Sequence, residues 1–455
     1  MSLKRNNNSE LNLILLHIAL GLVIFMLPIS AKLINLGVIF LAMLFIIASK
    51  NKVFAVLVAS AYIATSDVFF RMTGGLFFYE LHKYLLIIFV LMGFLFDGIK
   101  VKGYIYLLYI GLLLLTITFT TYNLTDEVRR MIAFNLAGPV SLGFVGFYFY
   151  KKKVSMQQLS KVLFYALLPI ISLVVYLFLY APSIRDVVTG TDSNFVTSGG
   201  FGPNQVATIL GVGIFILFSR LLLNKFRGIQ SFIELVLLCF ILFRGLVTFS
   251  RGGIFVAFGA VLILVLMMYM KGKSKFRLKI SKTLIWALIL GFSVWFYAVN
   301  RTSGLIEKRY ENKSALGVEK EDISTGRSEL FLLEFQAFME NPIFGIGVGK
   351  NKEYRFEKTG KIAASHNEIS RILAEHGSIG ALAFLILLLT PLLLRMENKK
   401  NIYFYSFYIL WLLTINHSAM RIAFPSFIYG LCLLDVHFPK AKKIAQSQES
   451  IKLSA

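Results

Sequence analysis

Long uninterrupted apolar runs recur along the whole chain, and they constrain its fold more than any other feature. A run of about 17–25 apolar residues can cross a hydrocarbon layer of about 30 Å as a helix. In lipid, a single segment satisfies its own backbone hydrogen bonds only as a helix, and these runs do not alternate as β-barrel strands do. The chain is therefore predicted to be an all-α polytopic membrane protein with about 12–14 transmembrane helices.

Fourteen candidate spans can be marked, of which the third, ninth and last are short. They are Leu11–Ile29, Leu33–Ala48, Val53–Ser66, Tyr79–Phe96, Tyr104–Thr121, Met131–Tyr150, Val162–Tyr180, Gln205–Ser219, Phe232–Val247, Gly253–Met270, Thr283–Val299, Ile379–Leu394, Ile402–Asn416 and Ile422–Leu434. Only 16% of the residues are charged, against roughly 25% in soluble domains. Residues 1–455 are expected to form one integral membrane domain.

The net charge of +23 is a topology signal. Basic residues concentrate in alternate short loops, which by the positive-inside rule lie in the cytoplasm. Both termini, including the tail 439–455, are then predicted to be cytoplasmic, and two long loops, 181–204 and 300–377, lie on the far side. Because the charge is spread over short loops, a nucleic-acid partner is not expected.

The interval Arg301–His376 interrupts the hydrophobic pattern for longer than any other part of the chain. It holds 12 of the 24 acidic residues and 12 basic ones, so its own charge is near zero. A membrane protein with so long a polar interval is expected to bind or react there. The two cysteines, Cys239 and Cys432, lie inside predicted spans, and no Walker loop, dinucleotide fingerprint or zinc motif occurs. No metal or cofactor is expected.

Isolated cations at the far-side ends of the spans are mostly arginines, which grip phosphate with two parallel hydrogen bonds. Snorkelling of an interfacial anchor is the alternative for each of them. They are Arg71, Arg129, Arg130, Arg185, Arg244, Arg251 and Arg421. Arg251 is the best candidate, because it follows Ser250, precedes Gly252 and Gly253, and starts a span. Glycines allow close approach of a ligand, and a helix N-terminus attracts anions.

Further candidates lie in and beside the two long loops. Segment 327–340 is predicted to be a helix with Arg327 at its N-terminal end, where a cation is unfavourable unless an anion shares the site. The glycines of 341–349 form either a simple turn or a backbone nest for an anion. His366 opens a helical stretch and, beside Asn367, can take a proton from a hydroxyl. Asn204 is either a helix N-cap or part of the wall of the site.

These motifs, in order, resemble the O-antigen ligase and O-antigen polymerase family. They are Gly202-Pro203-Asn204-Gln205, Ser250-Arg251-Gly252-Gly253, Gly326-Arg327-Ser328, Asn341-Pro342-Ile343-Phe344-Gly345-Ile346-Gly347, His366-Asn367 and Glu375-His376-Gly377-Ser378-Ile379-Gly380. The resemblance covers roughly residues 195–395 by motif. It implies a glycosyltransferase of the bacterial inner membrane that uses an undecaprenyl-diphosphate-linked glycan as donor, with the periplasmic loop 300–377 as active site and no metal.

By position, the resemblance assigns Arg251 and Arg327 to the diphosphate and His366 to catalysis. Arg71, Asn204, Ser250, Gly252 and Asn367 are the further substrate-binding candidates. The chemistry is consistent without the family, because two arginines can stabilise a leaving diphosphate and a histidine can activate an acceptor hydroxyl for an inverting displacement.

The sequence does not identify the acceptor. Lipid A core would make the protein a ligase, another glycan would make it a repeat-unit polymerase, and a protein hydroxyl would make it a protein transferase. From other classes, a flippase of lipid-linked glycan and a structural or assembly protein are the alternatives. A transporter is expected to bury ionisable residues in mid-span and to show internal repeats. This chain instead gathers its candidates at span ends and in one loop.

Overall fold

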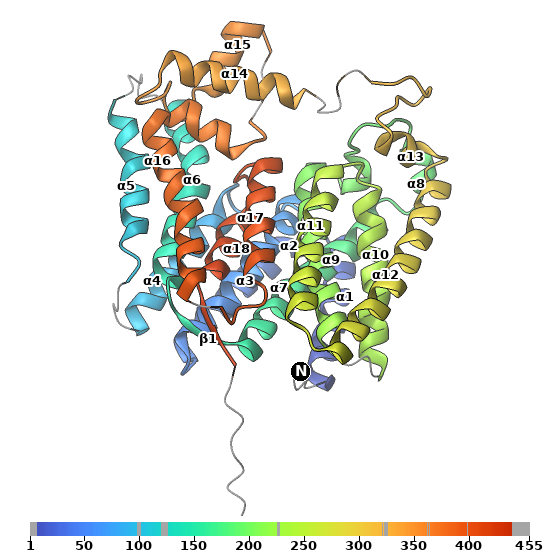
Figure 1. The fold of residues 1–455 in the computed structure, drawn as a ribbon. Coiled ribbons are helices and arrows are strands. Elements are labelled where there is room, and N and C mark those ends of the chain that lie inside the picture. The colour runs from blue at the N-terminus through green and yellow to red at the C-terminus, as the bar shows by residue number, and fades with distance from the viewer. Residues whose placement is uncertain are drawn as a thin grey trace, which may run out of the picture.

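The computed structural model of the protein describes residues 7–97, 102–119, 126–224, 228–320, 322, 326–361, 363, 365–397 and 399–438. Over these residues the chain is a bundle of helices with a single pair of three-residue strands (Figure 1). The prediction of an all-α polytopic membrane protein is confirmed.

The helices of the first half are α1 (Asn7–Met26), α2 (Ser30–Ala48), α3 (Lys52–Met72), α4 (Leu81–Asp97), α5 (Ile105–Thr118), α6 (Asp126–Phe149), α7 (Met156–Tyr180), α8 (Ile184–Val187), η1 (Val196–Ser198) and α9 (Pro203–Leu223). Those of the second half are α10 (Gly228–Leu246), α11 (Arg251–Lys271), α12 (Ser274–Arg301), α13 (Leu305–Tyr310), α14 (Arg327–Glu340), α15 (Asn351–Thr359), α16 (Glu368–Glu397), α17 (Phe404–Ser418) and α18 (Phe424–Cys432).

All fourteen predicted spans fall on helices, but the helices differ in length. Ten of those described are long and apolar enough to cross a membrane, by length and composition. The other four are α4, α5, α17 and α18, with 17, 14, 15 and 9 residues. The last of these would span only about 13 Å at about 1.5 Å per residue, and every one of its residues is buried. It is therefore an internal helix enclosed by its neighbours.

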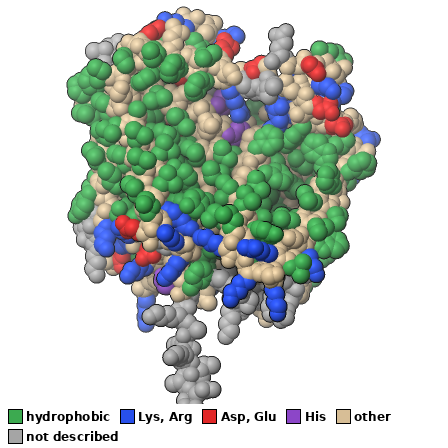
Figure 2. Space-filling model, in the orientation of Figure 1, with side chains coloured by type: hydrophobic (Ala, Val, Ile, Leu, Met, Phe, Trp, Pro, Cys, Tyr) green, Lys and Arg blue, Asp and Glu red, His purple; other side chains and the backbone are tan. Residues whose placement is uncertain are grey.

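The two ends of the bundle differ in character. Helices α13, α14 and α15, all from the interval 301–367, lie together at one end, here called the loop end (Figure 1). At the opposite end, strand β1 (Lys153–Ser155) pairs in parallel with β2 (Asp435–His437), and α1 begins there. The surface between the ends is largely apolar, with a band of Lys and Arg toward the end away from the loops (Figure 2).

The core lies around α3, α7 and α9, which are enclosed by other helices, whereas α1, α2 and α12 expose many apolar side chains. Small residues bring α9 and α11 into close contact. A Cβ at Gly211 would lie 2.5 Å from the carbonyl oxygen of Gly253, and a Cβ at Gly253 would meet the backbone of Ala207 at 2.4 Å. Glycines at such contacts let membrane helices approach backbone to backbone. As a result, α11 is held tightly against α9, and its N-terminus faces the loop end.

Candidate functional site

Four segments that are far apart in sequence meet at the loop end. They are the start of α11, the start of α14, the segment 365–367 that precedes α16, and the end of α17. A hollow at this end exposes histidine and basic side chains between largely apolar surfaces (Figure 2). One cavity here has a volume of about 390 Å³. Its lining consists of Arg327, Ser328, Leu330, Phe331, Leu332, Glu334, His366, Asn367 and Asn416. We call it the Arg327 cavity.

Arg327 and His366 line this cavity together, as the sequence predicted for a shared site. Arg327 is the first residue of α14, after Gly326 in a left-handed conformation. Burial, followed by the charge of Arg251, lowers the pKa of Arg327. Arg251, at the start of α11, is therefore close enough for electrostatic repulsion, although 76 residues separate the two in sequence. The structure thus brings together Arg251 and Arg327, which were predicted to hold the diphosphate, and His366, which was predicted to act on the acceptor.

A third arginine, Arg309 of α13, joins this group. Its backbone carbonyl accepts a hydrogen bond from Nη1 of Arg251 at 3.3 Å, and its own Nε donates to the carbonyl of Phe249 at 3.1 Å. Burial lowers the pKa of Arg309, and the charges of Arg251 and Arg327 lower it further, while Asp192 raises it. The Asp192 carboxylate is 3.8 Å away and largely exposed. Three partly buried guanidinium groups that repel one another form a strongly anion-attracting site.

His366 is held as a neutral imidazole. Burial, then the charges of Arg421, Arg327 and Arg355, lower its pKa from 6.5 to about 4. Its Nδ1 is buried and has no hydrogen-bond partner among the described residues. A neutral imidazole with an available nitrogen can accept a proton, and a bound anion would offset the arginine charges and raise its basicity.

A buried ion network positions the segment that carries His366. Glu334 of α14 accepts hydrogen bonds from Arg355, Ser365 and Ser370, and Arg355 also donates to Ser365 at 2.7 Å. Glu334 and Arg355 are only 2% and 1% exposed. Ser365 directly precedes His366, so the network joins α14, α15 and α16 around the predicted base. Removing one partner of such a network would leave a buried charge unpaired.

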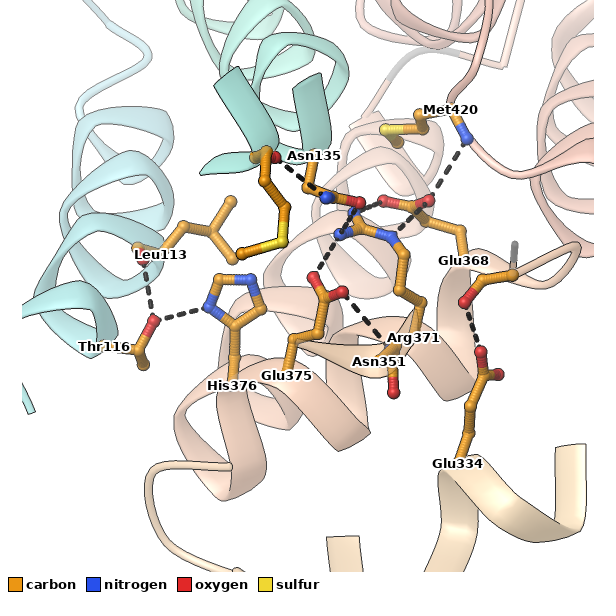
Figure 3. Close-up of polar contacts among 12 residues, drawn as sticks. Leu113, Thr116, Asn135, Glu334, Asn351, Glu368, Arg371, Glu375, His376 and Met420 are labelled. Carbon is orange, nitrogen blue, oxygen red and sulfur yellow. Dashed lines mark hydrogen bonds and ion pairs between the residues drawn. The ribbon is translucent and has the colours of Figure 1, made fainter. Parts of the chain in front are cut away.

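A second ion network holds the first turns of α16 (Figure 3). The Arg371 guanidinium lies between two carboxylates, donating to Glu368 through Nε at 3.1 Å and to Glu375 through Nη1 at 2.6 Å. Glu368 also accepts from the backbone N–H of Met420 at 3.1 Å, and Asn351 donates to Glu375 at 3.3 Å. These contacts connect α15, α16 and the loop after α17 into one rigid wall.

The glycine-rich loop 341–349 is built into α16 and is not an open anion nest. The N–H groups of Ile346 and Gly347 donate to the carbonyls of Ala374 and Glu375 at 2.9 and 3.1 Å. Gly377 kinks α16 with φ 61° and ψ −145°, and a Cβ there would lie 2.5 Å from the Ile343 carbonyl oxygen. The structure therefore favours turn chemistry, and Gly377 interrupts the helical conformation of α16.

The predicted residues Asn204 and Ser250 form a contact of their own. The Ser250 hydroxyl donates to Oδ1 of Asn204 at 2.8 Å, which ties the start of α11 to the start of α9. The N-cap prediction for Asn204 is wrong, because Gly202 is the N-cap and Pro203 already occupies the first helical turn. Proline suits that position because its missing N–H would be unsatisfied there anyway.

Asn367, and not His366, begins the helix that follows. Its Oδ1 accepts from the backbone N–H groups of Ile369 and Ser370 at 2.8 and 3.4 Å, and α16 starts at Glu368. Its side-chain amide donates to Asn416. The predicted helical start at His366 is therefore wrong by two residues. The Asn367 side chain acts as the N-cap, because its oxygen accepts from backbone N–H groups of the first helical turn that have no partner within the helix.

Arg71 is the predicted site residue that lies apart from the others. Its Nε donates to Asp67 one turn earlier in α3 at 2.8 Å, and its guanidinium stacks over the Tyr79 ring at 4.0 Å. It lines neither the Arg327 cavity nor the larger one described next. Its Nη2 lies 3.7 Å from the Glu80 carboxylate, so the Arg71 charge is balanced by acidic groups of the protein itself.

A larger cavity of about 770 Å³ lies beside the Arg327 cavity. Ser365 lines the larger cavity and His366 lines the smaller, so this short segment separates them. The larger cavity presents charged side chains, among them Lys83, Arg371, Glu375 and Arg421, together with apolar ones such as Phe134. We call it the Ser365 cavity.

His417 is a residue of the site that sequence reasoning missed. It lies at the end of α17, is 6% exposed, and its Nδ1 is 2.9 Å from Nη1 of Arg327. A Cβ at Gly252 would lie 2.1 Å from two atoms of its ring. A signal was available, because His417 directly follows the predicted span Ile402–Asn416, and an ionisable residue bordering a membrane segment is a functional candidate. Arg309 carried no such signal within a loop that holds twelve basic residues.

Comparison with known proteins supports the resemblance carried by the motifs. Residues 234–385 match the family model described as O-antigen ligase. This range contains α11, α14 and the His366 segment, which together supply Arg251, Arg327 and His366. No curated protein matches the chain. Over residues 234–385, this polytopic membrane protein is therefore similar to the O-antigen ligase family.

Proposed function

We propose that this protein transfers an oligo- or polysaccharide from undecaprenyl diphosphate to an acceptor during surface polysaccharide assembly. The convergence of Arg251, Arg309 and Arg327 beside His366 carries this proposal. Mutual repulsion among three guanidinium groups is relieved by an anionic ligand, and a lipid diphosphate supplies that charge. Its polyprenyl chain needs only apolar contacts, which the exposed faces of the membrane helices provide.

The reaction follows from these positions. Arg251 and Arg327 hold the diphosphate while His366 takes the proton from an acceptor hydroxyl. The acceptor oxygen forms a bond to the anomeric carbon as the bond from that carbon to the diphosphate oxygen breaks. The electron pair leaves with undecaprenyl diphosphate, whose charge the arginines stabilise. Attack opposite to the leaving group inverts the anomeric configuration, and no metal ion is required for this charge stabilisation.

The Ser365 cavity suits the acceptor. At about 770 Å³ it lies within the range of about 300–1,000 Å³ that small-molecule sites occupy. It adjoins the Arg327 cavity across Ser365 and His366, so an acceptor there and a donor in the Arg327 cavity would meet at the proposed base. A glycan or lipid A-core sugar offers hydroxyl groups to the charged side chains of this cavity.

A deletion in the native host tests the function and separates its two main versions. Loss of attached polymer, with lipid-linked polymer accumulating, identifies a ligase, whereas shortened glycan ladders on gels identify a polymerase. Complementation with His366→Ala should fail, and complementation with His437→Ala should succeed, because His437 lies in β2 at the opposite end of the bundle. Unchanged surface glycans after deletion would refute the proposal.

The periplasmic location of the loop end and the inner membrane as its site belong to the same proposal. Support comes from the basic short loops at the other end and from the match to the O-antigen ligase family. A flippase is less well supported, since the three arginines and His366 gather at one end of the bundle.

A further inference from the structure

His417 is buried between Gly252 at the start of α11 and Arg327, yet only one of its two ring nitrogens has a hydrogen-bond partner among the described residues. The side chain is 6% exposed, and Nε2 has no hydrogen-bond partner among the described residues. A buried polar group without a partner has lost its hydration and gained no hydrogen bond in return, which destabilises the protein. His366 Nδ1, at the same site, likewise has no partner among the described residues, and such groups indicate a ligand that completes them.

The partner of the other nitrogen determines which kind of group Nε2 is. Nδ1 lies 2.9 Å from Nη1 of Arg327. A guanidinium nitrogen can only donate, so Nδ1 must accept through its lone pair. In the neutral imidazole the proton is then on Nε2. The unpartnered atom is therefore a hydrogen-bond donor.

The backbone beside His417 is shaped for its ring. Gly252, in the first turn of α11, would place a Cβ 2.1 Å from Cε1 and Nδ1 of His417 and 2.7 Å from Cγ. No other residue type leaves room for the ring in this place. The ring is thus held between the first turn of α11 and Arg327, at the position where the two arginine-bearing helices, α11 and α14, begin.

We propose that the Nε2–H group of His417 donates a hydrogen bond to a phosphate oxygen of the lipid diphosphate, as a third contact beside Arg251 and Arg327. This inference rests on the proposed function. A phosphate oxygen is an acceptor without a hydrogen, which matches an orphan donor, and the neighbouring arginines attract the same anion. His417 thereby binds the donor and at the same time orients the Arg327 guanidinium.

Two substitutions separate these roles, because the side-chain amides of glutamine and asparagine each place a polar atom near the position of one ring nitrogen of histidine. The amide of Gln, in His417→Gln, can place an N–H near the position of Nε2. The amide of Asn, in His417→Asn, can place an oxygen near Nδ1 and keeps the acceptor for Arg327, but it does not reach the ligand. If Nε2–H contacts the diphosphate, His417→Asn should bind roughly 10- to 150-fold more weakly than the unmodified protein, and His417→Gln should bind at least tenfold more tightly than His417→Asn.

The assay is calorimetric titration of the full-length protein in detergent with farnesyl diphosphate, which carries a prenyl chain and the diphosphate but no sugar. Equal affinities of the two variants, or tighter binding by His417→Asn, overturn the inference, and the latter result makes His417 only a support for Arg327. Failure of the unmodified, monodisperse protein to bind farnesyl diphosphate overturns the proposed function as well. The two failures are therefore distinguishable before any variant is compared.

Discussion

Gly252→Ala is the smallest change expected to disable the site, and its effect can be worked out from the structure. The added methyl group would lie 2.1 Å from the His417 ring, whereas ordinary contact begins at 3.4 Å. The ring must therefore retreat by about 1.3 Å, which is the difference between these distances. The methyl group is attached to the backbone of a helix and cannot move aside.

A retreat of this size breaks the contact between His417 and Arg327. The bond measures 2.9 Å, and hydrogen bonds longer than about 3.5 Å contribute little. Losing a hydrogen bond to a charged group costs about 1.5–3 kcal/mol, or roughly 10- to 150-fold in rate. We expect the initial rate of glycan transfer in proteoliposomes to fall by that factor while the protein still inserts and stays monodisperse.

Two comparisons make this prediction specific. Gly291→Ala in α12 adds the same methyl group where nothing lies within 4 Å, so it should leave the rate unchanged. In a His417→Ala background, where the ring is absent, Gly252→Ala should cost nothing more, because the two changes act through one contact. Full activity of Gly252→Ala, or an undiminished loss in the His417→Ala background, would refute the reasoning.

Four further outcomes are expected. Arg251→Lys and Arg327→Lys keep the charge but lose the bidentate fork, so each should weaken donor binding roughly 10- to 150-fold. His366→Ala should leave donor binding unchanged and slow transfer about 10²–10⁴-fold. Weaker donor binding by His366→Ala, with unchanged binding by the two lysine variants, would contradict these roles. The pKa of His366 is about 4 before the donor binds, and the bound diphosphate should raise it. Because kcat/KM reports the free enzyme and kcat the donor complex, the acid limb of kcat should lie at higher pH than that of kcat/KM. Acid limbs at the same pH would argue against His366 as the base. Transfer should persist in EDTA, and abolition with rescue by magnesium or manganese would refute stabilisation by arginines alone. With both native cysteines replaced, Lys320→Cys should react with an impermeant thiol reagent in intact spheroplasts and Lys273→Cys should not; the opposite labelling would reverse the topology.

The spans were predictable because their signal is local. An apolar run long enough to cross the hydrocarbon layer must be helical whatever packs beside it, and every marked span falls on a helix. The signal for helix α14 was equally local, and the helix begins at Arg327 as predicted. The lengths of the helices were less predictable. The marked span Ile422–Leu434 corresponds to α18, which is an internal helix of nine residues. Its run of apolar residues does not distinguish burial in protein from burial in lipid.

Some local signals in the sequence were present but not used. Asp67 and Arg71 are four residues apart, a spacing that puts opposite charges on one face of a helix. The structure contains this ion pair, so Asp67 on the same helix balances the charge of Arg71. Pro203 in the sequence before Asn204 similarly marks the first helical turn, so that the N-cap falls earlier.

By itself, the sequence determined the class of the protein and the order of its helices, because both depend on composition along the chain. It predicted Arg251, Arg327 and His366 as site residues, because each lies in a short motif. Only the tertiary structure decided that Gly252 makes room for His417, that Arg309 joins the arginines, and that Ser365 and His366 separate two cavities. These relations connect residues such as Arg327 and His417, 90 positions apart. They arise because close packing of helices, and not proximity along the chain, sets which side chains meet.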